Sequence, residues 1–215
     1  MTTLPIFPLE SVLLPGLPLA LRLFEPRFLA LLDRVLADDG SFGVVLIERG
    51  SEVGGGDQRF GVGTLARIAD VSVREGWVAV SAWGDSRFEV DEWLPDDPYP
   101  LARVRALPPL VWSADLAPRF AATERAVRRA LAVVSEFAET RWPASVVLAD
   151  DPVAAVWQLA GIAPVSALDH VALLRSTTAE GLLDRTATLA AEAAALAQFS
   201  TGPDGDRPDG DRPDA

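Results

Sequence analysis

The chain has 215 residues, of which 49% are hydrophobic, and its formal net charge is −12. That length suffices for one large or two small domains. No apolar run is long enough to span a bilayer, and no basic patch precedes an apolar stretch at the N-terminus. We therefore expect neither a membrane span nor a secretory signal, and we place the protein in the cytoplasm.

Two residue types are missing, and their absence excludes several mechanisms. There is no Cys, so disulfides, thiolate nucleophiles and Cys-based metal sites are excluded. All 19 basic residues are Arg, which excludes a Walker A loop, a Ser-Lys dyad and a Schiff base. Codon bias in a GC-rich genome is the simplest explanation for the missing Lys. The acidic balance also repels phosphate backbones, so nucleic acid is not an expected partner.

The first 50 residues alternate between strand and helix signals. "TLPIFPL" and "LALRLF" predict short strands separated by prolines. Phe28, Leu32, Val35 and Leu36 then recur at the spacing of one helix face, with Pro26 suited to the first turn. "FGVVLI" (42–47) is a continuous apolar run, which is typical of a strand buried on both faces.

Further strands follow a glycine-rich segment, "GSEVGGGD" (50–57), which predicts a flexible loop. "GVGTLARIADVSV" and "GWVAVSAW" flank a predicted hairpin turn at residues 74–76, and "RFEVDEW" and "PYPLARVRAL" predict two more strands. Six or more strands with one helix predict a small β-barrel or curled sheet over residues 1–110.

The period becomes helical from Ser113 onward. Apolar residues at helical spacing predict one helix over about 116–134, and Asp151-Pro152 predicts the start of another that Gly161 closes. Ser166 with Asp169, and Thr177 with Glu180, have capping-box spacing. Residues 111–199 are thus predicted to form an α-helical bundle, which makes the chain α+β. The repeat "GDRPDGDRPD" lacks apolar residues, so we predict a disordered tail at 200–215.

Few residues suggest catalysis. The single histidine, His170, lies in "SALDHVALL", and a lone His without clustered ligands is more often structural. Three adjacent carboxylate pairs occur next to Gly or Pro, where turn and capping roles are the simpler interpretation. These pairs are Asp38-Asp39, Asp96-Asp97 and Asp150-Asp151. We therefore predict no catalytic residue, no metal and no cofactor.

Trp77 and Trp83 share one face of a predicted strand, with Ala79 and Ser81 between them. Large rings flanking small residues could form a shallow apolar trough that accepts a side chain of a peptide. Burial of both rings in the core is the simpler interpretation, because large apolar residues are usually buried.

The N-terminal stretch resembles the substrate-binding, N-terminal domain of the Lon protease family. The matching residues are Phe7-Pro8-Leu9, Leu14-Pro15-Gly16 and Phe24-Glu25-Pro26-Arg27-Phe28 with Leu32. "GVGTLARI" and "RFEV" fall where that family has later strands, while "DPVAAVWQLAG" is similar to a family helix in outline only. The resemblance covers residues 4–199 and is strongest over the first 110.

This resemblance implies a PUA-like β-domain followed by a helical bundle. It also implies substrate recognition without the ATPase and Ser-Lys peptidase domains of Lon, which have no counterpart here. We expect the motif residues Phe7, Pro8, Leu9, Pro15, Gly16, Glu25, Pro26 and Arg27 to be architectural, with Glu25 and Arg27 at a helix start.

The leading hypothesis is a non-enzymatic protein-binding module, acting as an adaptor in protein quality control. Its partners would be unfolded or peptide segments, or a protease or chaperone. The expected binding residues are Phe24, Arg27, Trp77, Trp83 and Arg87. Two alternatives stay open: a hydrolase of small substrates that uses carboxylates, and a structural subunit that forms oligomers through its Ala-rich last helix.

Overall fold

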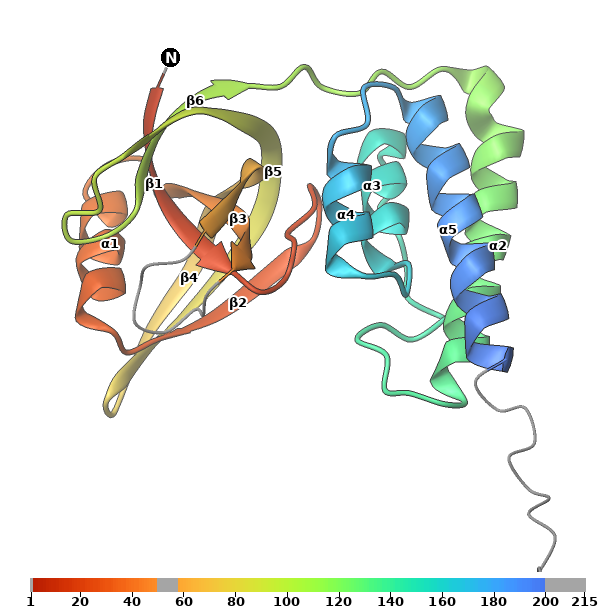
Figure 1. The fold of residues 1–215 in the computed structure, drawn as a ribbon, viewed down its shortest axis with the longest axis horizontal. Helices are drawn as coiled ribbons and strands as arrows, with labels where there is room; N and C mark the ends of the chain where they lie inside the picture. Colours follow the sequence, from red (N-terminus) through yellow and green to blue (C-terminus); the bar gives the residue numbers. More distant parts are fainter. Residues whose placement is uncertain (1, 50–57, 200–215) are drawn as a thin grey trace, which may run out of the picture.

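The computed structural model describes residues 2–49 and 58–199, so the predicted loop at 50–57 and the predicted disordered tail lie outside it. The strands are β1 (Thr2–Leu9), β2 (Pro18–Leu23), β3 (Ser41–Arg49), β4 (Gln58–Arg74), β5 (Trp77–Leu94) and β6 (Leu101–Ala106). The helices are α1 (Pro26–Leu36), α2 (Ala117–Ser135), α3 (Pro152–Ile162), α4 (Ala167–Leu174) and α5 (Ala179–Phe199). The described residues form the mixed α+β fold that the sequence predicts, with the strands on one side and the helices α2 to α5 on the other (Figure 1).

The strands close into a ring. Their hydrogen-bonded order is β2-β5-β4-β3-β1-β6, and β6 also pairs with β5. β5 can do this because it is 18 residues long: residues 78–83 pair with β2 and residues 88–94 pair with β6. Only the β1–β3 pair is parallel among the strand pairs of the described residues.

α1 packs on the β part through one apolar face, as its spacing predicts. Pro26 occupies the first turn, where its missing N–H has no cost. The Phe28 ring stacks on Phe7 of β1 with 4.1 Å between ring centroids. Val35 is also buried, whereas Leu36 at the end of the helix is exposed.

β1 and β3 are buried on both faces, because successive residues belong to two different apolar clusters. Ile6 and Val45 lie in a small cluster with Phe88, while Phe7 and Val44 lie in the large one. The sequence run 42–47 is confirmed as a strand buried on both faces.

The helices α2 and α5 lie side by side in the helical part (Figure 1). Val127, Ala130 and Leu131 of α2 are buried, as are Leu182 and other residues of α5. At the start of the two helices, Arg119 pairs with Glu180 at 2.9 Å and also with Asp184. Among the described residues, the helices α2, α3, α4 and α5 follow the linker after β6.

The predicted helix caps are partly confirmed. The Asp151 side chain accepts a hydrogen bond from the Ala154 N–H at 2.8 Å, and Ser166 and Asp169 form a complete capping box. The predicted box at Thr177 is wrong: α5 begins one residue later, and Thr178 Oγ1 accepts from the Gly181 N–H at 3.0 Å. Gly161 does not close α3 but lies inside it, where an added Cβ would meet Leu17 Cδ1 at 2.2 Å.

The β part and the helical part share one apolar core. The large cluster runs from Phe7 and Phe28 through Leu13, Leu14 and Leu17 to the buried faces of the helices. The predicted boundary near residue 110 falls in the linker between β6 and α2, and Leu110 itself is buried. None of the helices in residues 2–49 and 58–199 has both the length and the hydropathy needed to cross a bilayer.

Candidate functional site

The Phe24-Glu25-Pro26-Arg27-Phe28 motif forms the entry into α1. Arg27 Nε donates to Glu25 Oε2 at 3.1 Å, and both side chains are mostly shielded from solvent. The Arg27 guanidinium lies 4.3 Å from the centroid of the Phe28 ring, which is itself stacked on Phe7. These contacts connect the turn between β2 and α1 to the first turn of the helix.

The first two parts of the motif lie in β1 and in the loop after it, and Gly16 of this loop contacts both β5 and α3. Phe7, Pro8 and Leu9 are buried in β1, and Pro15 is buried in the loop that follows. Gly16 has a φ of 75°, which favours glycine, and its N–H donates to the Gly84 carbonyl at 2.8 Å. Its own carbonyl accepts from Gln158 Nε2 of α3 at 3.0 Å. This loop therefore joins the two parts of the molecule.

Arg87 is not available to a ligand, which corrects its expected role. Arg87 is only 5% exposed. Its guanidinium donates hydrogen bonds to the carbonyls of Leu174 (2.8 Å), Ser176 (2.6 Å) and Pro108 (2.6 Å). The guanidinium also lies over the Trp157 ring of α3. Burial lowers the pKa of Arg87 from its usual high value. Arg87 thus fastens the end of α4 and the linker to β5.

The other expected binding residues lie at two separate ends of the β2–β5 pair. Phe24 is 54% exposed and follows β2 at the end where Trp77 begins β5. Trp77 is half-buried, and the Arg22 guanidinium lies 4.6 Å from its ring centroid. Trp83 pairs with Pro18 at the opposite end, roughly 20 Å away at ~3.3 Å per residue. These residues therefore do not form one trough.

Trp83 is 51% exposed, so the simpler interpretation of a buried ring is wrong for this residue. It lies at a hollow of about 170 Å³, which we call the Trp83 hollow. Pro18 and Trp83 supply the strand side of this hollow, and Trp142 and Val147 supply the helical side. Val147 is 88% exposed, which makes the hollow an apolar surface open to solvent.

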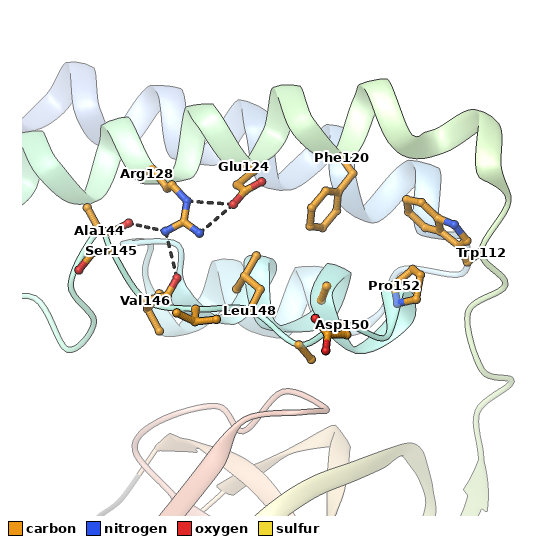
Figure 2. Close-up of a pocket in the computed structure, with 13 residues that line it drawn as sticks. Trp112, Phe120, Glu124, Arg128, Ala144, Ser145, Val146, Leu148, Asp150 and Pro152 are labelled. Carbon is orange, nitrogen blue, oxygen red and sulfur yellow. Dashed lines mark hydrogen bonds and ion pairs between the residues drawn. The ribbon is translucent and has the colours of Figure 1, made fainter.

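A larger groove lies on the other side of the same segment, between α2 and residues 144–150 (Figure 2). We call it the α2 groove; its volume is about 710 Å³. Its lining residues are Trp112, Phe120, Glu124, Arg128, Ala144, Ser145, Val146, Val147, Leu148, Ala149, Asp150, Pro152 and Ala155. Val146, Val147 and Leu148 line both the groove and the Trp83 hollow, so this segment forms a wall of each.

Arg128 fixes one end of the α2 groove. Its Nη1 donates to the carbonyls of Ala144 and Val146, and its Nε and Nη2 donate to Glu124 Oε1 at 3.0 and 2.7 Å (Figure 2). At the other end, the rings of Trp112 and Phe120 meet edge to face at 6.1 Å. This groove was not predicted from the sequence, because residues 142–150 have no helical period; the apolar run at 146–148 after Pro143 was the available signal.

One member of each carboxylate pair considered for catalysis has a structural contact. Asp39 accepts from the Ser41 N–H, Asp96 forms a two-pronged pair with Arg59, and Asp151 caps α3. His170 is largely shielded in α4, and burial is the main cause that lowers the pKa of its imidazole. Within residues 2–49 and 58–199, no His, Asp and Glu side chains are grouped as metal ligands would be.

The ring of strands joined to a helical bundle is the fold of Lon N-terminal domains. A crystal structure of a Lon N-terminal domain protein from Xanthomonas campestris is 26% identical, with a TM-score of 0.63 over 86% of this chain and 96% of that chain. The N-terminal domain of a Mycobacterium avium complex Lon protease is 15% identical, with a TM-score of 0.62 over 89% of this chain and 99% of that chain, and it shares the fold.

The model of the ATP-dependent protease La (LON) substrate-binding domain matches residues 3–191, and the chain belongs to this family. The resemblance seen in the sequence is thereby confirmed. Family membership gives the coarse function of a substrate-recognition module. No curated protein matches the chain.

Proposed function

We propose that this protein is a non-catalytic recognition module that binds exposed apolar segments of other proteins and acts as an adaptor in protein quality control. The observation that carries the proposal is the open apolar surface at the Trp83 hollow, in a chain whose family is defined by substrate binding. Exposed tryptophan and valine side chains at one site are typical of binding surfaces rather than of a monomer's ordinary exterior.

The physical basis of binding is the removal of apolar area from water. A ligand side chain that covers Trp83 and Val147 gains about 25 cal/mol for each Å² of apolar surface buried. Tryptophan suits this role because its large ring has few rotatable bonds and so loses little conformational freedom when it is covered. The site needs no charged group of its own to bind an unfolded segment.

The residue composition of the chain supports a non-catalytic function. The chain has no Cys or Lys, and the carboxylates of Asp39, Asp96 and Asp151 are engaged in turns, an ion pair and a helix cap. Within the described residues, no group of His, Asp and Glu side chains could hold a metal ion for hydrolysis.

The test is a titration of the full chain with a fluorescently labelled, permanently unfolded protein, followed by anisotropy. We expect saturable binding, and we expect Trp83→Ala to weaken it about tenfold, as for an exposed aromatic at the centre of an interface. The matched control is Val73→Ala, an apolar side chain that is 79% exposed in the β4–β5 hairpin, away from the site. Absence of saturable binding, or an equal loss in both variants, would contradict the proposal.

A further inference from the structure

The segment along the α2 groove has backbone groups that make no hydrogen bond within the described residues. The N–H and C=O groups of Val147 and Leu148 have no such partner, although both residues line the groove. Their neighbours are all engaged: Val146 O accepts from Arg128 at 3.1 Å, and the Ala149 N–H donates to Gln158 Oε1 at 2.7 Å. Backbone groups in this state bind water or an incoming chain.

The walls around these backbone groups are apolar. Phe120 and Trp112 lie on the α2 side, and the Leu148 side chain points toward α2 across the groove (Figure 2). The volume of about 710 Å³ falls within the range of ~300–1,000 Å³ that is usual for ligand sites. A groove with apolar walls and free backbone groups fits an extended polypeptide with a large apolar side chain.

The charges at the groove favour a basic neighbour for that side chain. Glu124 is neutralised by Arg128. The Asp150 carboxylate lies between Leu148 and Pro152 in Figure 2 and forms no ion pair or hydrogen bond with a described residue. The chain as a whole carries a formal charge of −12, so its long-range field attracts cations as well.

We propose that the α2 groove binds an extended segment of a protein substrate in which a large apolar residue is followed closely by Arg or Lys. The apolar side chain packs between Phe120, Trp112 and Leu148. The ligand backbone pairs with Val147 and Leu148, and its basic side chain meets Asp150. This assignment rests on the proposed function and adds a sequence preference to it.

Three labelled peptides of about ten residues test the assignment by anisotropy with the full chain. The first carries one Phe with an Arg two residues later, the second has Glu in place of that Arg, and the third has N-methyl-Phe in place of Phe. We expect the Glu peptide to bind at least about threefold more weakly, as for a solvent-exposed charge contact. The N-methyl peptide should bind about fivefold more weakly, because it loses a backbone donor.

Two variants connect these effects to the groove. Asp150→Asn should abolish the preference for Arg over Glu, whereas the control Asp38→Asn, an exposed carboxylate in the turn after α1, should retain it. Phe120→Ala should weaken all three peptides, provided that its circular dichroism matches the parent. Because Asp150 is exposed and forms no hydrogen bond or ion pair with a described residue, we expect its variant to stay folded and informative.

The outcomes separate this assignment from the proposed function. If unfolded protein binds in a Trp83-dependent manner but the peptides show no preference that Asp150→Asn removes, the groove assignment is overturned and the proposed function stands. If unfolded protein does not bind at all, the proposed function fails. Concentration-dependent dimerisation that Phe120→Ala suppresses would assign the groove to a second copy of the chain and overturn the peptide assignment.

Discussion

Arg87 is a buried cation that is held by carbonyl oxygens and, among the described residues, by no carboxylate. Two of its three acceptors, Leu174 and Ser176, lie at the C-terminal end of α4, where the helix dipole favours positive charge. The planar guanidinium reaches these oxygens and the Pro108 carbonyl at the same time. The geometry requires the several donors of Arg, which a lysine ammonium on a single stem would not place in the same way.

Arg87→Met should lower the free energy of unfolding by about 2–4 kcal/mol, because the buried carbonyl of Leu174 and the partly buried carbonyl at Pro108 lose their donor. Urea unfolding followed by circular dichroism measures the change. The control is Arg103→Met in β6, whose ion-pair partner is the exposed Glu92 of β5; its effect should stay below about 1 kcal/mol. Similar losses of unfolding free energy in both variants would show that the buried hydrogen bonds of Arg87 do not stabilise the junction between β5, α4 and the linker.

Arg87 also shows why the site was only partly predictable at the scale of residues. Strict alternation places Trp77, Trp83 and Arg87 on one face of a strand, and Trp83 is indeed exposed. Between Gly84 and Arg87, however, β5 has one more residue than its partner β4, since Thr64 pairs with Arg87 and Ala66 with Gly84. Such a bulge changes which face a residue occupies and is invisible to a period of two.

At the scale of elements, the helices were predictable where a cap coincided with a change of period. Asp151 before Pro152 and Ser166 before Asp169 meet both conditions. In the run Ser176-Thr177-Thr178 three adjacent hydroxyl residues qualify as caps, so spacing alone cannot choose among them. The structure selects Thr178, because α5 begins at Ala179.

Thr178→Ala should destabilise the protein by about 1 kcal/mol, since the Gly181 N–H loses its acceptor at the start of α5. Thr177→Ala should change the free energy of unfolding by less than about 0.5 kcal/mol, because Thr177 is exposed and bonds to no described residue. Denaturant unfolding of the two variants checks this. A larger loss of unfolding free energy for Thr177→Ala than for Thr178→Ala would indicate that Thr177 is the N-cap, as the sequence pattern predicted.

The α4 helix gives the protein a pH-dependent component of stability through His170. Burial is the largest cause that lowers the pKa of this imidazole from 6.5; a hydrogen bond with the Ala160 backbone and the Asp169 charge oppose the shift, and Arg141 adds to it. The unfolded state therefore binds a proton more readily than the folded state below pH 6.5. This component of stability is present at pH 7.5 and is lost progressively as the pH falls below 6.5.

His170→Gln should flatten that dependence between pH 7.5 and 5.5, a window that mostly excludes carboxylate titration. The informative quantity is the difference in the free energy of unfolding between parent and variant at each pH. The decrease in net negative charge as the pH falls affects both proteins alike and cancels in this difference. The parent should lose stability relative to the variant as the pH falls. A difference that is constant across the window would contradict a shifted pKa for His170.

At the scale of the whole molecule, local patterns predicted the order of strands and helices but not how the sheet closes. Strand identity follows from periods and turn residues, which the sequence displays. The second partner of β5 depends on the length of that strand, which carries β2 on residues 78–83 and β6 on residues 88–94. The α2 groove escaped prediction for a related reason, since its segment at 144–150 is shaped by the contacts of Arg128 and Gln158 rather than by a repeat.

The shared core predicts that the β part and the helical part unfold together. Leu14 and Leu17 of the β part pack in the same apolar cluster as Trp157 and Leu159 of α3, and Arg87 adds polar contacts across the junction. Separating the parts would expose this apolar area to water, which makes a half-folded state unfavourable. We expect one urea transition, with coincident midpoints for helix circular dichroism and tryptophan fluorescence.

A fragment of residues 1–110 makes the prediction sharper. It lacks α3, so Leu14 and Leu17 lose the surface that covers them, and the fragment should show no cooperative transition or should aggregate. The full-length Arg87→Met variant serves as the companion measurement, because weakening the junction should lower the midpoints of both probes equally. Two separate transitions in the parent chain, or a stable and cooperatively folded fragment, would mean that the β part holds its structure without the helices.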